Sequence, residues 1–245
     1  MFDQIDHRPW PPPNRAWSWR QSWHDLLFAH WPVSTDTLRP LVPAELEIQE
    51  FDGTSWVSVV PFRMTGVTRR PLPAIVGMSA FPEINLRLYV ERDGKPGIWF
   101  LSLDTTNPLA VWAARRFFHL PYFRARISLS GLPGEVRYDS VRLHSPRGLR
   151  FAATYQPNGG TYHAEENSLE HWLTERYCLY ARTRTGRLLR AEVHHHPWPL
   201  QPADVQVECN QLADPHGFSL GGQPSLTHFS RHIDVVVWSP EYLAE

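Results

Sequence analysis

The strongest constraint on the fold of this chain is a strictly alternating segment at residues 83–90. Apolar side chains occupy the even positions and polar or aromatic side chains the odd ones: Ile84, Leu86, Leu88 and Val90 against Glu83, Asn85, Arg87 and Tyr89. Successive side chains of a strand point to opposite faces, so the pattern predicts a β-strand with two different faces. The dipeptide Asp93-Gly94 then predicts a tight turn, and residues 98–103 the return strand.

Other β-rich segments lie before and after this hairpin. We expect further strands from Leu26 onward and at 46–51 paired with 56–64, at 123–130, 135–144 and 149–155 as a meander, at 177–182 paired with 188–195, and at 205–209 and 233–238. Helices are expected at 35–42, at 109–118 after the Asn107-Pro108 cap, and from a capping box at Asn167 to about residue 175. Because strands and helices do not alternate regularly, the predicted class is α+β with a large, closed, antiparallel or mixed sheet and two or three helices.

The length of 245 residues fits one all-β-type domain. Residues 1–20 are rich in proline and tryptophan and predict an extended N-terminal arm, whose indoles we expect to lie against the main body. Residues 21–245 then form the single domain.

Charge and cysteine content exclude several classes of protein. The formal net charge of -1 argues against a nucleic-acid partner, which would require a concentrated cationic face. No apolar run reaches the roughly 18 residues of a membrane helix, and the N-terminus lacks the apolar core of a signal peptide, so we expect no membrane partner and a cytoplasmic protein. The two cysteines, Cys178 and Cys209, are too few for a disulfide framework and are expected to be small core side chains.

The first candidate site is the row formed by Glu83, Asn85 and Arg87. On the outside of the sheet these residues would be an ordinary solvated row. Inside a barrel, a carboxylate, an amide and a guanidinium would converge in a cavity and offer hydrogen bonds to a ligand. The residues alone favour the solvated row, because burying charges without partners is costly.

The second candidate is the set Glu192, His194 and His196, which share one face of a strand. Two imidazoles and a carboxylate could form a metal site. Three adjacent histidines also occur at strand ends with hydrogen-bonded rings, so we expect no metal. No glycine loop of the kind that holds nucleotide phosphates is present, and we expect no other cofactor. The metal site stays open as a weaker alternative.

Three stretches resemble the YqjF-like family of uncharacterised bacterial proteins. They are residues 38–48 (LRPLVPAELEI), residues 81–87 (FPEINLR) with the turn at 94–97 (GKPG), and residues 196–200 (HPWPL). That family is similar in turn to the acetoacetate decarboxylase superfold. The resemblance implies a β-barrel with a central cavity and flanking helices.

Acetoacetate decarboxylase forms a Schiff base on a lysine whose pKa is lowered by a second lysine. The resemblance places that lysine pair at Tyr122 and Phe123 of this sequence. Lys95 is the only lysine, and the Asp93-Gly94 turn predicts that it is solvated and unreactive. The resemblance therefore implies a protein that is not a Schiff-base decarboxylase.

The resemblance places Glu83 where the decarboxylase has an active-site glutamate. It therefore favours the second arrangement, in which Glu83, Asn85 and Arg87 face a cavity, over the solvated row. A cavity that also receives Tyr122, Phe123, His194 and His196 would suit a small amphipathic organic acid or ketone, with an acid held by Arg87.

Two functions follow as hypotheses. The first is a small-molecule-binding barrel that has lost the nucleophile. The alternative is an acid–base enzyme, a lyase or isomerase of a keto acid, with Glu83 as base and Tyr122 or a histidine as acid. A homo-oligomer formed through the tryptophan-rich arm is compatible with either hypothesis.

Overall fold

The alternating segment is a β-strand, and it forms the expected hairpin. The computed structural model describes residues 2, 4–72, 80–131, 134–145 and 148–244. In it, β4 (Phe81–Arg92) and β5 (Lys95–Thr105) pair antiparallel up to Arg92 and Lys95. Asp93 and Gly94 have φ angles of 55° and 68°, which is the positive-φ pair that a two-residue turn of this hand requires.

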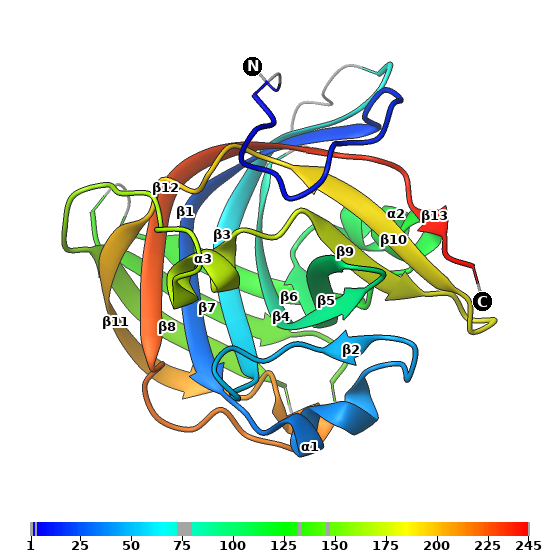
Figure 1. Cartoon of the computed structure of the whole chain (residues 1–245). Coiled ribbons are helices and arrows are strands. Elements are labelled where there is room, and N and C mark those ends of the chain that lie inside the picture. Colours follow the sequence, from blue (N-terminus) through cyan, green and yellow to red (C-terminus); the bar gives the residue numbers. More distant parts are fainter. Residues whose placement is uncertain (1, 3, 73–79, 132–133, 146–147, 245) are drawn as a thin grey trace.

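The other elements surround this hairpin (Figure 1). In chain order they are β1 (Trp19–Pro32), α1 (Thr35–Leu38), a 3₁₀ turn (Arg39–Leu41), β2 (Glu47–Ile48), β3 (Trp56–Arg69), α2 (Pro108–Phe117), β6 (Tyr122–Ser130), β7 (Val136–Arg142), β8 (Arg150–Pro157), α3 (Leu169–Thr174), β9 (Cys178–Arg182), β10 (Leu188–His194), β11 (Gln201–Asn210), a second 3₁₀ turn (Asp214–His216), β12 (Leu226–Val237) and β13 (Glu241–Tyr242).

Local sequence signals located several of these elements correctly. β6, β7 and β8 form the expected antiparallel meander, and β9 pairs with β10 as expected. The Oδ1 atom of Asn107 accepts hydrogen bonds from the backbone N–H groups of Leu109 at 3.0 Å and Ala110 at 3.2 Å, and Pro108 occupies the first turn of α2. An N-cap side chain followed by proline therefore marks the helix start, as predicted.

Two local predictions were wrong. The expected hairpin of 46–51 with 56–64 does not form: β2 pairs over two residues with β4, and β3 lies between β1 and β4, where it makes long antiparallel ladders with both strands. The cap of α3 is Ser168 rather than Asn167, since the Ser168 hydroxyl accepts from the N–H of His171 at 3.2 Å.

Within the described residues the strands join into one 13-stranded mixed sheet in the order β13-β10-β9-β5-β6-β7-β8-β11-β12-β1-β3-β4-β2, with additional pairings of β10 with β12 and of β5 with β4. β5 pairs parallel with β6 and β9, and the other pairings are antiparallel. The protein is therefore mostly β, with short helices, as predicted.

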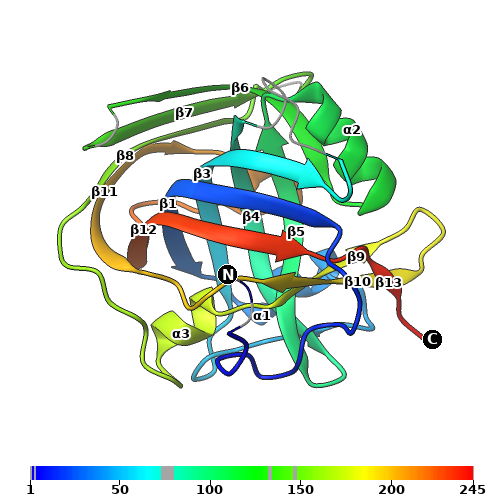
Figure 2. The same cartoon turned by 90° about the horizontal axis from the view of Figure 1, so that it is seen from above.

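The strands separate two buried regions. Figure 2 shows β6 and β7 on one side of β1, β3 and β12, and β9, β10 and α3 on the other. The even side chains of β4, such as Ile84, Leu86 and Leu88, belong to an apolar core shared with Tyr138 and Phe151 of β7 and β8. Both faces of β4 are thus covered, and the face with the polar residues borders a separate space. No helix among the described residues is long and apolar enough to cross a membrane.

Candidate functional site

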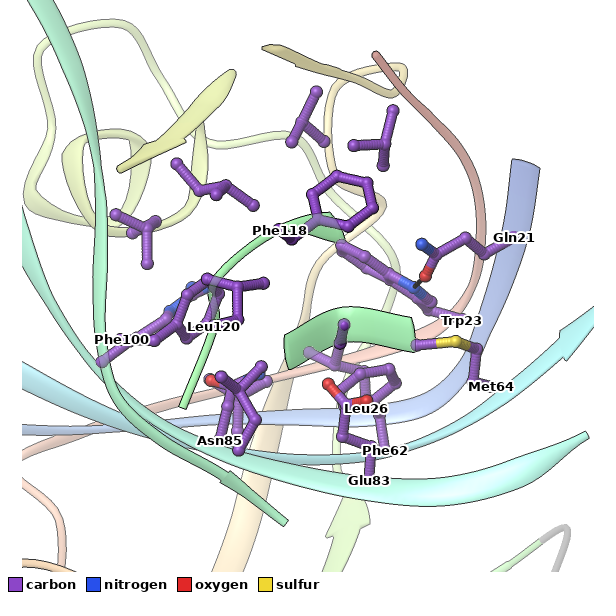
Figure 3. A pocket seen from close by; sticks show the side chains of 18 of the residues that line it. Gln21, Trp23, Leu26, Phe62, Met64, Glu83, Asn85, Phe100, Phe118 and Leu120 are labelled. Atoms are coloured by element: carbon purple, nitrogen blue, oxygen red, sulfur yellow. Dashed lines mark hydrogen bonds between the residues drawn. The ribbon is translucent and has the colours of Figure 1, made fainter. Parts of the chain in front are cut away.

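A cavity of about 170 Å³ lies on the polar side of β4. Its walls are mainly aromatic and aliphatic side chains from β1, β3, β4, β5, α2, β9, β10 and β12 (Figure 3). A volume of this size has room for on the order of ten water molecules, which is enough for a small organic molecule. The cavity combines apolar walls with a few polar groups, as small-molecule sites do.

Glu83, Asn85 and Arg87 all line this cavity. Their exposed fractions are only 2%, 6% and 8%. The solvated row that the residues alone favoured is therefore wrong. The reason is that α2, β9 and β10 form further walls of the cavity, so this face of β4 is covered by other elements and does not meet bulk water.

Glu83 and Tyr122 form one polar end of the cavity. The Tyr122 hydroxyl donates to Oε2 of Glu83 at 2.8 Å. Burial raises the pKa of Glu83 to about 8; the hydrogen bond from Tyr122 opposes this shift and the nearby charge of Asp104 adds to it. At neutral pH Glu83 is therefore mostly a neutral acid, able to donate its proton in a hydrogen bond.

Arg87 forms the other end. Its Nε and Nη2 atoms are buried without a hydrogen-bond partner, and its guanidinium lies 5.2 Å from the centre of the Phe28 ring. Burial lowers the pKa of Arg87, and nearby Tyr89 opposes that shift. No ion pair is formed by Arg87 within the part of the chain that the structure describes. Between the two ends, the Oδ1 atom of Asn85 is also buried without a partner.

A second arginine, Arg176, lines the cavity and was missed by the sequence analysis. It follows α3, where its Nε donates to the backbone oxygen of Trp172 at 2.7 Å and its Nη1 donates to Gln49. Its Nη2 is buried without a partner. Burial lowers the pKa of Arg176 to about 10, and the positive charge of Arg87, which lines the same cavity, contributes to this shift.

Three of the predicted ligand-binding residues do not line the cavity. Phe123 lies beside Tyr122 on β6, so its ring points to the other face, where it stacks with Arg142 at 4.2 Å. His194 and His196 are absent from the lining, whereas His195 is present. The sequence analysis therefore assigned the wrong face of this strand to the cavity: Val193 and His195 line it, and the even-numbered histidines do not.

His195 is fully buried, and both ring nitrogens face backbone oxygens: Nδ1 lies 2.7 Å from that of His196 and Nε2 lies 3.4 Å from that of Arg176. Burial lowers the pKa of His195, so the neutral ring dominates. The neutral ring has one N–H, which can serve one of the two oxygens at a time.

The opposite face of β10 holds the N-terminal arm. The Glu192 carboxylate accepts from the indole of Trp10 at 2.7 Å and from Arg8 at 3.1 Å, and it lies 3.3 Å from Lys95. A stacking contact of 5.6 Å joins His7 to the ring of His194. The tryptophan-rich arm thus folds back onto its own domain around Glu192, and self-association through the arm stays a prediction.

These contacts bear on the weaker metal hypothesis. The oxygens of Glu192 face the cations of Arg8 and Lys95 and the indole N–H of Trp10 instead of an open ligand position. Among the residues that the structure describes, no group of three or more His, Cys, Asp or Glu side chains could hold a metal ion, so Glu192, His194 and His196 are not brought together as ligands.

Lys95 is not the freely solvated tip residue that the turn predicted. Its side chain is 28% exposed, pairs with Glu192 and stacks over Trp10 at 5.3 Å. It does not line the cavity. Of the two cysteines, Cys178 lines the cavity and burial raises its pKa to about 12, so it is an unreactive thiol at neutral pH.

Several solved structures have the same fold as this chain. An acetoacetate decarboxylase from Legionella pneumophila superimposes with a TM-score of 0.62 at 13% identity, over 98% of this chain and 93% of that one. An acetoacetate decarboxylase-like enzyme from Sphingomonas wittichii RW1 gives 0.62 at 13% identity, over 94% of each chain. A structure of the enduracididine biosynthesis enzyme MppR with pyruvate gives 0.61 at 14% identity, over 98% and 93%. The fold is that of the acetoacetate decarboxylase-like proteins.

Sequence comparison narrows the class. Residues 20–234 match DUF2071, described as an uncharacterised conserved protein. The uncharacterised protein YqjF of Bacillus subtilis strain 168 is 45% identical over 238 residues, covering 97% of this chain and 98% of the relative. The chain therefore belongs to the DUF2071 family, and the resemblance to YqjF-like proteins is confirmed.

Proposed function

We propose that the cavity binds a small amphipathic organic acid, with the carboxylate held by Arg87. The observation that carries this proposal is the buried, unpartnered edge of the Arg87 guanidinium, formed by Nε and Nη2. A buried charge without a counter-ion is costly, and a carboxylate matches such an edge with two parallel hydrogen bonds. The neighbouring Arg176 supplies one further free N–H.

The enclosure of the cavity supports binding. We infer that the strands close into a barrel around it, because β4, β3, β1, β12, β10, β9 and β5 pair in succession and β5 pairs again with β4. Such an enclosure strengthens charge–charge interactions by excluding water. An amphipathic ligand would place its apolar part against rings such as Trp23, Phe62 and Phe118 (Figure 3).

The proposed function does not include imine chemistry on a lysine. The only lysine of the sequence, Lys95, is held outside the cavity by Glu192. Tyr122, one of the two residues at the position that the resemblance assigns to the amines, presents a hydroxyl to Glu83 instead. A neutral ketone would then bind by accepting hydrogen bonds, without forming a covalent bond to the protein.

Acid–base catalysis is a second candidate, favoured by the Glu83–Tyr122 pair. With its pKa raised to about 8, Glu83 would act as the proton donor at neutral pH and become a base only at higher pH. This reverses the role that the sequence suggested for it. The substitution Glu83→Gln would remove such turnover while keeping the hydrogen-bonding shape of the side chain.

Calorimetric titration with hexanoate tests the binding proposal. We expect binding to the wild-type protein and a loss of about tenfold or more in affinity in Arg87→Met, because hydrogen bonds to charged groups contribute about 1.5–3 kcal/mol. The matched control is Arg137→Met, since Arg137 lies on the surface with 71% of its side chain exposed. Equal affinities in all three proteins, or no binding of any short-chain acid to the wild type, would refute the proposal.

A further inference from the structure

The two polar ends of the cavity are separated along one strand. Glu83 and Arg87 are four residues apart on the same face of β4, which places their Cα atoms about 13 Å from each other at roughly 3.3 Å per residue. β4 pairs with β3 in unbroken register from Phe81 to Leu88, with Glu83 opposite Phe62 and Arg87 opposite Ser58. The β4–β5 ladder is irregular between Leu86 and Arg87, but the unmatched residue, Leu101, lies on β5, so β4 itself carries no inserted residue between Glu83 and Arg87.

The contacts of each side chain hold it at its own end. The Arg87 guanidinium lies over Phe28, and its charge lowers the pKa of both Arg176 and His30. The Glu83 carboxyl is bonded to Tyr122 on β6, next to Asp104 on β5. The cavity that both groups line is otherwise bordered by apolar side chains such as Leu26 and Phe100 (Figure 3), and Asn85 is the residue midway between Glu83 and Arg87 on the same face of β4.

The two ends recognise different chemistry. The Arg87 end offers N–H donors with a positive charge, which suits an anion. The Glu83 end offers a neutral carboxyl donor in a desolvated setting, which suits an uncharged acceptor such as a carbonyl oxygen and disfavours a second carboxylate.

We propose that the ligand is an oxo acid whose carbonyl is several carbons from its carboxylate, so that the carboxylate binds Arg87 and Arg176 while the carbonyl accepts from Glu83. This inference rests on the proposed function and adds the second contact and its distance. If the polar groups are as far apart as the Cα atoms, two hydrogen bonds of about 3 Å leave on the order of 7 Å between the two ends of the ligand. A 3-oxo acid is too short to make both contacts, whereas a 6-oxo or 7-oxo acid spans the gap.

The experiment is a calorimetric series that compares each oxo acid with its parent straight-chain acid. The probes are 3-oxobutanoate, 5-oxohexanoate, 6-oxoheptanoate and 7-oxooctanoate, against butanoate, hexanoate, heptanoate and octanoate. We expect no gain for the 3-oxo acid and a gain of about fivefold or more for the 6-oxo or 7-oxo acid, as one additional buried hydrogen bond provides.

Variants assign the gain to its source. Glu83→Leu should abolish the gain from the oxo group while the parent acids still bind, and Glu83→Met provides a second replacement should the first fail to fold. Glu135→Leu is the matched control, because Glu135 is a surface glutamate outside the cavity.

The possible results separate this inference from the proposed function. A gain that is absent at every length, is largest for the 3-oxo acid, or survives in Glu83→Leu overturns the inference and leaves acid binding by Arg87 intact. Failure of all the parent acids to bind overturns both.

Discussion

Two buried arginines on opposite sides of the central strands have contrasting surroundings. Arg142 lies on β7, and its Nε is 3.0 Å from both carboxylate oxygens of Asp104, whose neighbour across the β4–β5 ladder is Ile84 of the apolar core. Arg87 points into the cavity and makes no ion pair among the residues described. The two side chains are almost equally buried, so burial alone does not distinguish a structural arginine from a candidate binding arginine. The presence or absence of a carboxylate partner does.

The largest expected effect on stability comes from removing the arginine that has a carboxylate partner. Arg142→Met should lower the free energy of unfolding by about 3–5 kcal/mol, because it leaves Asp104 buried without its partner. Urea denaturation at neutral pH measures the loss. Arg87→Met serves as the matched control and should show no such loss. A cost below about 1 kcal/mol for Arg142→Met would mean that the pair has little structural importance.

The next effect concerns pH and the Glu83 end of the cavity. Burial raises the pKa of Glu83 from the ordinary 4.5 to about 8, so the folded protein holds a proton there that the unfolded chain releases above pH 4.5. The wild type should therefore lose stability between about pH 4.5 and 8, by a few kcal/mol at about 1.4 kcal/mol per pKa unit.

Urea denaturation of Glu83→Gln across this range isolates the contribution of Glu83. The variant lacks the titrating group, so its advantage over the wild type should grow as the pH rises from 4.5 to 8 and then level off. The control is Glu135→Gln, whose difference from the wild type should stay constant. A pH-independent difference for Glu83→Gln would show that the folded-state pKa is not raised.

The smallest effect comes from an exposed arginine. Arg137 lies 3.2 Å from Glu135, with 71% and 45% of the two side chains exposed. Arg137→Ala should change the free energy of unfolding by less than about 1 kcal/mol, because solvent screens such pairs. Differential scanning calorimetry at low and high salt provides the measurement. A loss comparable to that of Arg142→Met would remove the link between burial and the importance of a carboxylate partner.

Sequence patterns predicted the parts of the fold that depend on neighbouring residues. The alternation of β4, the Asp93-Gly94 turn and the Asn107-Pro108 helix start are local signals, and all three were confirmed. The pairing of β2 with β4 was not predictable, because residue spacing does not reveal long-range partners.

The candidate site was predicted only in part, for similar reasons. Which face of β4 borders a cavity depends on strands far away in the sequence, so the residues alone favoured the wrong side and the family resemblance was needed. His195 was missed by one position, since three adjacent histidines do not define strand parity near Pro197. Arg176 was missed because it lies in the connection between α3 and β9, where no periodic pattern marks it.

The most direct test is the thermal unfolding of the wild type and Arg87→Met, each without and with excess hexanoate. Removing a buried guanidinium that has no carboxylate partner should leave the free variant at least as stable as the wild type. Hexanoate should raise the melting temperature of the wild type more than that of the variant, because the stabilisation by a ligand grows with its affinity for the folded state. A free variant that melts well below the wild type, or an equal shift of both proteins by hexanoate, would contradict the assignment of Arg87 as the acid-binding residue.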